Sequence, residues 1–255
     1  MAQLLYRGQH LVSVTDAARV LHADRKEAAK KLAHWAAKGW LRRVRRGLYV
    51  PVPLEAENPA SWSEDALYIA DAVWAPCYFS GWTAANHWSL TEQVFRTTVV
   101  KTAERVRSAH QRLLDHEYLV SHLSAEAIWG VTPIWRAGRR LQMADPARTV
   151  IDMLDTPSVG GGIRHVSEVL AHYLEEHDAR QLVVYGDRLG NRSVFKRLGY
   201  LAAALGSNQQ NLVAACRERL SAGVVQLEPG GPRDGKLAPT WGLRVNVHVA
   251  RGEPS

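Results

Sequence analysis

The stretch SVTDAARVLHADRKEAAKKLAHWAAKGWLRRVRRGLYVP, residues 13–51, decides the fold that we predict for the N-terminal part of the chain. Ser13 and Asp16 stand three positions apart, and Asp24 and Glu27 repeat that spacing. A short polar residue followed three positions later by an acidic one is typical of the first turn of a helix. The two spacings therefore predict two short helices in succession, separated by a tight turn.

The second predicted helix runs from Asp24 to about Lys38, where Gly39 can end it in a left-handed conformation. Apolar residues recur along it at three- and four-residue spacing, as on a face that packs on a core: Ala28, Ala29, Leu32, Trp35 and Ala36. Its other faces are basic, and four residues are candidates for contact with nucleic acid: Arg25, Lys26, Lys30 and Lys31. A basic face can also be merely solvated, so the helix alone does not decide the function.

The residues that follow form a predicted β-hairpin with an arginine-rich tip. Residues 40–51 have the pattern of two short strands, and Gly47 supplies the positive φ that the turn requires. Four arginines surround the turn and repel one another unless an anion lies against them: Arg42, Arg43, Arg45 and Arg46. Two capped helices, a basic second helix and this hairpin predict a winged helix-turn-helix over residues 1–53 that binds double-stranded DNA. A weaker helical pattern covers residues 2–10.

The positive charge of the chain is concentrated in the same region. The 255 residues have a formal net charge of +7. Residues 1–53 hold eleven Lys or Arg against three acidic residues, a net +8, whereas the remaining 202 residues hold 21 basic and 22 acidic side chains, a net −1. This asymmetry favours a polyanion-binding module joined to a neutral domain.

Residues 51–62 contain three prolines and few apolar residues, which is typical of a linker. Beyond it we expect a larger mixed α/β domain over residues 60–255, with a helix-rich C-terminal part and a subdivision near 157–162, so that the chain is of the α+β class. Periodicity and capping predict helices near 63–73, 80–90, 145–154, 163–177, 179–189, 193–205 and 208–221, and strands near 94–101, 118–122, 132–135, 141–143 and 241–247.

Two of these helices carry charged residues with a predicted role. Arg148 and Asp152 stand one turn apart, and we favour an internal ion pair in a docked helix over a functional site. Ser80 is expected to cap the helix that follows it. The helix at 193–205 is expected to have a basic side.

No motif for catalysis, metal or cofactor binding is recognised. The eleven histidines are scattered, and two cysteines cannot form a cysteine-rich metal site. A nuclease would require an acidic residue and a Glu-x-Lys on neighbouring strands, and the predicted strands have no Glu-x-Lys. The three glycines at 160–162 precede no Gly-Lys-Ser/Thr. We therefore expect no enzyme, catalytic residue, cofactor or metal; without an apolar run of membrane-spanning length or a signal peptide, we also expect a cytoplasmic location and no membrane partner.

Five segments resemble the AbiEi-type antitoxins of type IV toxin–antitoxin systems: GWLRRVRRGLYVP at 39–51, SGWTAANH at 80–87, DPARTVIDML at 145–154, FKRLGYL at 195–201 and WGLRVN at 241–246. The resemblance implies a protein that represses its own operon at inverted repeats in its promoter and neutralises a nucleotidyltransferase toxin through its C-terminal domain. The long tail after Gly223 departs from the smallest relatives. Two other functions stay open: a transcriptional regulator whose C-terminal domain senses a ligand or self-associates, and a structural protein that binds RNA.

Overall fold

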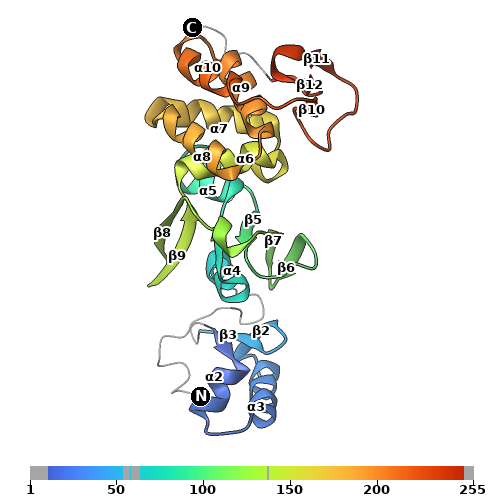
Figure 1. Ribbon diagram of the computed structural model, residues 1–255. Coiled ribbons are helices and arrows are strands. Elements are labelled where there is room, and N and C mark those ends of the chain that lie inside the picture. Colours follow the sequence, from blue (N-terminus) through green and yellow to red (C-terminus); the bar gives the residue numbers. More distant parts are fainter. Residues whose placement is uncertain (1–10, 54–57, 59–63, 137, 250–255) are drawn as a thin grey trace.

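The computed structural model describes residues 11–53, 58, 64–136 and 138–249. Figure 1 shows the N-terminal module, residues 1–53 of which 11–53 are described, at one end, a six-stranded sheet in the middle and the C-terminal helices at the other end. The chain is a mixed α/β protein, as expected from the sequence. The helix predicted at 2–10 lies outside the described residues, and so does most of the predicted linker.

The N-terminal module contains two capped helices, as predicted. Helix α2 (Val14–Val20) begins at Ser13, whose Oγ accepts from the Asp16 N–H at 3.1 Å. Helix α3 (Arg25–Ala37) begins at Asp24, whose carboxylate accepts from the Glu27 N–H at 2.8 Å. Gly39 follows α3 with a φ of +76°, the left-handed conformation that its lack of a side chain allows.

The strands of this module form a small antiparallel sheet with two buried faces. Strand β2 (Leu41–Arg45) pairs with β3 (Leu48–Pro51), and β1 (Val12–Ser13) pairs with the other edge of β3. Side chains alternate between the faces. One face packs on α2 and α3 through Val12, Leu41 and Tyr49. The other packs on the centre of the molecule through Leu11, Val44, Leu48 and Val50.

The central sheet has the strand order β6-β7-β5-β4-β9-β8. Its strands are β4 (Cys77–Phe79), β5 (Thr97–Thr102), β6 (His110–Leu113), β7 (His116–His122), β8 (Val131–Arg136) and β9 (Arg139–Ala144). The β5–β7 and β4–β9 pairs are parallel and the others are antiparallel. Helix α4 (Ala66–Trp74) and the apolar cluster that includes the N-terminal module pack against this sheet. The N-terminal module therefore shares an apolar core with the central sheet.

A buried charged cluster joins this sheet to the helices. Helix α6 (Pro146–Asp155) is capped by Asp145 as predicted, and the expected ion pair is present at 3.0 Å between the Arg148 Nε and Asp152 Oδ1. The fully buried Asp152 carboxylate also accepts from Lys101 at 3.1 Å and from the Ser80 hydroxyl at 2.6 Å. Burial alone would raise the pKa of Asp152, but Lys101, Arg148 and the Ser80 hydrogen bond outweigh it and lower this pKa.

Ser80 differs from its expected role in one respect. It precedes helix α5 (Gly81–His87), yet its side chain makes no capping hydrogen bond, because the hydroxyl is directed to Asp152 instead. The motif residue is therefore part of the buried cluster.

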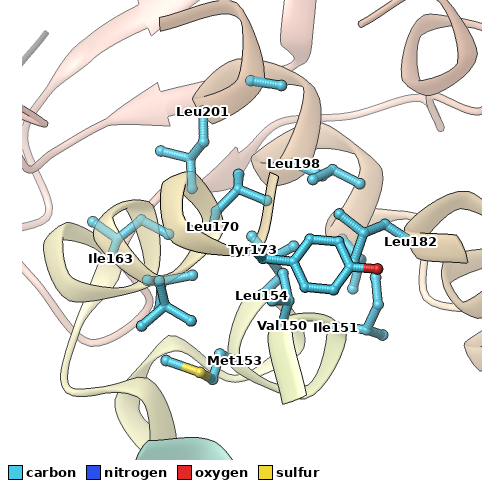
Figure 2. Close-up of a cluster of buried hydrophobic side chains, with 14 of the residues drawn as sticks. Val150, Ile151, Met153, Leu154, Ile163, Leu170, Tyr173, Leu182, Leu198 and Leu201 are labelled. Atoms are coloured by element: carbon cyan, nitrogen blue, oxygen red, sulfur yellow. The ribbon is translucent and has the colours of Figure 1, made fainter. Parts of the chain in front are cut away.

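The C-terminal part is helical around a second core. Helices α7 (Ile163–Glu176), α8 (Ala179–Leu189), α9 (Ser193–Leu205) and α10 (Gln210–Arg217) surround α6, preceded by the 3-10 turn η2 (Pro157–Gly160). Figure 2 shows the meeting of side chains from α6, α7, α8 and α9 around Leu170 and Tyr173. A three-stranded sheet of β10 (Val225–Gln226), β12 (Leu243–Val245) and β11 (Lys236–Ala238) follows.

The prediction that helix α9 has a basic side is wrong. Lys196 and Arg197 are 0% and 4% exposed. Both side chains can be buried because they donate hydrogen bonds to backbone carbonyls. The Lys196 ammonium donates to Gly223 O at 2.7 Å, and the Arg197 guanidinium donates to Leu154 O at 2.9 Å. These two cations tie the C-terminal segment to the helical core and offer no binding surface.

Candidate nucleic-acid interface

The first half of α3 presents basic side chains to solvent. Arg25, Lys26 and Lys30 are exposed, whereas Ala28 and Leu32 are buried in the core of the module. The Asp24 cap fixes where the helix begins and so fixes the direction of the first two cations.

The arginine hairpin, formed by β2 and β3, is shaped by a bulge. The pairing register shifts between Arg43 and Arg45, and Gly47 closes the turn with a φ of +80°. Val44 between them is buried against the centre of the molecule, while Arg43, Arg45 and Arg46 are exposed. The buried valine thus anchors a tip whose arginines remain free to meet a ligand.

Helix α3 and this hairpin enclose a groove of about 730 Å³, here called the basic groove. Its lining comprises Ser13, Val14, Thr15, Arg25, Lys26, Ala29, Arg43, Arg46, Gly47 and Tyr49. Four of these ten residues are cationic and none is acidic. Segments of α3 and β2 that are separated in sequence thus create one concentrated positive surface, which suits an extended polyanion.

The other four predicted contact residues lie outside this lining. Lys30 and Arg45 are exposed beside it, and Lys31 pairs with Glu27 at 2.9 Å along α3. Arg42 lies on the other face of β2, where its guanidinium donates to the Asp115 carboxylate at 2.9 Å. This hydrogen bond lowers the pKa of Asp115.

Sequence reasoning did not assign Ser13 and Thr15 to the groove. Ser13 was recognised only as a cap, and Thr15 only as a helical position, yet both line the groove beside Arg46. The exposed Thr15 hydroxyl is a neutral donor of the kind that accompanies arginines at phosphates. The sequence signal for this role was the place of Thr15 in the first turn of a capped helix, where a side chain next to the cap is exposed.

Within the described ranges, no group of three or more His, Cys, Asp or Glu side chains has a geometry that could hold a metal ion. No helix of the described part is long and apolar enough to cross a membrane.

The fold and the groove define a class: a mixed α/β protein with a small basic helical module at its N-terminus. Residues 1–52 match the family described as transcriptional regulator, AbiEi antitoxin. The N-terminal module is therefore similar to the AbiEi antitoxin transcriptional regulators, in agreement with the resemblance recognised in the sequence.

Over the whole chain, the fold is similar to that of the RV2827C protein from Mycobacterium tuberculosis, with a TM-score of 0.66. The two sequences are 16% identical, and the similarity covers 95% of this chain and 88% of that one. At this identity the likeness concerns the fold alone. No curated protein sequence matches the chain.

Proposed function

We propose that this chain is a non-catalytic transcriptional regulator that binds double-stranded DNA, and that its N-terminal module, residues 1–53, is a winged helix-turn-helix. The basic groove carries this proposal, because it combines four cations from a capped helix and a hairpin without an acidic lining residue. The AbiEi-type match over residues 1–52 supports it independently.

The side chains divide by position into two roles. Arg25, Lys26 and Lys30 project from the start of α3, so they are the proposed contacts in the major groove, where arginine and lysine discriminate guanine edges. Arg43, Arg45 and Arg46 are the proposed phosphate contacts of the wing.

Lys31 and Arg42 can join these contacts only by exchanging a carboxylate for a phosphate. Glu27 holds Lys31 and Asp115 holds Arg42 in the free protein. We therefore rank these two below the other proposed contacts.

We further propose that residues 60–255 form the antitoxin domain, with a subdivision near 157–162, and that the chain acts in the cytoplasm on inverted repeats in its own promoter. Its toxin would be a nucleotidyltransferase. This part rests on the AbiEi antitoxin description and on the motifs at 80–87 and 145–154.

The DNA-binding proposal is tested with the full chain and the DNA upstream of its own gene. Arg25→Ala and Lys26→Ala should reduce the ratio of affinities for promoter and random DNA, because a lost base contact costs about 1–3 kcal/mol of discrimination. Arg180→Ala, an exposed arginine of α8, is the matched control. Binding of the wild-type chain that is no tighter to the promoter than to random DNA refutes autorepression.

The antitoxin proposal is tested by co-expression. A nucleotidyltransferase encoded beside this gene should arrest growth when expressed alone, and the full chain should restore growth. An Arg43→Ala/Arg46→Ala variant should still restore growth, because the proposed toxin contacts lie outside the N-terminal module. Absence of such a neighbouring gene, or failure of the wild-type chain to rescue, favours the regulator without a toxin.

A further inference from the structure

A second arginine-rich hairpin lies outside the N-terminal module. Strands β8 and β9 pair antiparallel at the edge of the central sheet, and their connecting end carries Arg136, Arg139 and Arg140. Residues 127–144 contain these three arginines and no acidic residue. The hairpin is therefore a local positive surface within a part of the chain that is neutral on average.

The register divides this surface into two faces. Trp135 stands directly opposite Arg140, and Arg136 stands directly opposite Arg139. Residues opposite one another in an antiparallel pair share a face. One face thus presents an indole, 72% exposed, beside an exposed guanidinium, and the other presents two guanidinium groups side by side.

The charges at the tip are only partly compensated: Asp65 lines the same pocket as Arg136, and the Arg139 charge counteracts the rise that burial causes in the pKa of Asp71. Arg139 lies over the ring of Tyr68 at 4.5 Å. Arg136 and Arg140 form no salt bridge with any acidic side chain in the described ranges. Like charges directly opposite one another destabilise a strand pair, so Arg136 and Arg139 weaken the free hairpin. An anion at this tip would remove that penalty.

Protection of an exposed sheet edge is the alternative explanation. Charged residues on an edge strand discourage pairing with a second chain. That role accounts for the arginines but not for Trp135, because a large exposed aromatic side chain on the same edge favours association. Arginine beside an apolar wedge is instead the combination with which proteins enter a DNA minor groove.

We propose that the β8–β9 hairpin is a second DNA contact: Trp135 enters the minor groove of the duplex held by the N-terminal module, and Arg136 and Arg140, on opposite faces of the hairpin, bind phosphates on the two sides of that groove. The inference rests on the proposed DNA-binding function. In Figure 1 the free end of the hairpin projects from the sheet toward the end of the molecule that carries the N-terminal module.

The experiment measures the salt dependence of binding to a random-sequence duplex of about 40 base pairs, because phosphate contacts do not depend on sequence. The Arg136→Gln/Arg140→Gln variant should lower the magnitude of the slope of log K against log salt by about 1.8, since each phosphate contact contributes about 0.9. Trp135→Ala should weaken binding several-fold and leave the slope unchanged.

The control is Arg180→Gln/Arg192→Gln, which removes the same charge from exposed arginines of the C-terminal helical part. Its slope should equal that of the wild type. An equal loss of slope in the control and in the hairpin variant would reveal an effect of net charge and overturn the inference. Equal thermal unfolding of all variants verifies that they fold.

The two proposals fail in different ways. If the wild type does not bind the duplex, or if Arg43→Gln/Arg46→Gln retains the full slope, the proposed function itself is wrong. If those two results are as expected but the Arg136 and Arg140 variant binds like the wild type, only the second contact is refuted. Loss of a co-purifying protein partner or of RNA binding, with the DNA slope intact, also refutes it.

Discussion

Arg42 and Arg43 are neighbours in sequence but lie on opposite faces of β2, and this difference gives a sharp test of the proposed DNA-binding face. Arg43 is exposed and lines the basic groove. The Arg42 side chain is only 19% exposed and pairs with Asp115 of the central sheet region. Replacing each in turn by alanine removes the same charge from positions with different surroundings.

The expected magnitudes follow from those surroundings. Loss of one phosphate contact reduces the salt slope by about 0.9, which at about 0.15 M salt corresponds to roughly a five-fold loss of affinity. We expect this loss for Arg43→Ala, with a change in unfolding free energy within about 0.5 kcal/mol, because the side chain is exposed. For Arg42→Ala we expect an unchanged slope and a destabilisation of up to about 1 kcal/mol from the lost pair and packing.

The assays are fluorescence anisotropy of a labelled duplex over a series of salt concentrations, and unfolding of the same proteins in urea. Asp115→Ala serves as a control for Arg42→Ala, because it breaks the same pair and leaves the arginine in place. If Arg42→Ala loses slope and Arg43→Ala does not, DNA binds on the other face of β2, and the assignment of the basic groove is wrong.

Three further predictions concern stability. Asp152→Ala should cost about 3–5 kcal/mol in urea unfolding, because it leaves two buried cations without their counterion. The folded-state pKa of Asp152 is lowered, so the carboxylate stabilises the fold fully above its unfolded pKa of about 4. This stabilisation is lost as the pH falls through the folded-state pKa. An unfolding free energy that differs between Asp152→Ala and the wild type by the same amount at neutral and at acid pH would refute this. Gly199→Ala should destabilise α9 by about 1–3 kcal/mol, because a Cβ there overlaps the Trp241 ring, and a thermal midpoint equal to that of the wild type would contradict this packing.

The parts of the fold that were predictable from sequence are those with local signals. The Ser13 and Asp24 caps determine both N-terminal helices within a few residues, and Asp145 followed by proline does the same for α6. Strands β1 and β4 have two and three residues, so neither shows a pattern of its own. They exist because β3 offers β1 a partner and because β5 and β9 lie on either side of β4, which is a tertiary effect.

The candidate site shows the same limit. Capping and composition predict the basic module and distinguish its helix from its hairpin, but they do not separate the four arginines of the hairpin by face. Alternation along β2 already separates Arg42 from Arg43, because successive strand residues point to opposite faces. The bulge that exposes Arg45 beyond buried Val44 has no sequence signal, since it depends on the cluster against which Val44 packs.

The charge distribution is informative on a shorter scale than a domain. Residues after 53 have a net charge of −1, which favoured a neutral partner domain. That average combines buried cations such as Lys196 with the exposed Arg136 and Arg140 of the β8–β9 hairpin, which form no salt bridge within the described residues. A buried cation bonded to carbonyls exerts little force on a distant phosphate, whereas an exposed and unpaired one attracts it within about one Debye length. Exposure and pairing, rather than net charge, therefore decide which cations of this chain can meet DNA, and by that criterion the second hairpin resembles the first.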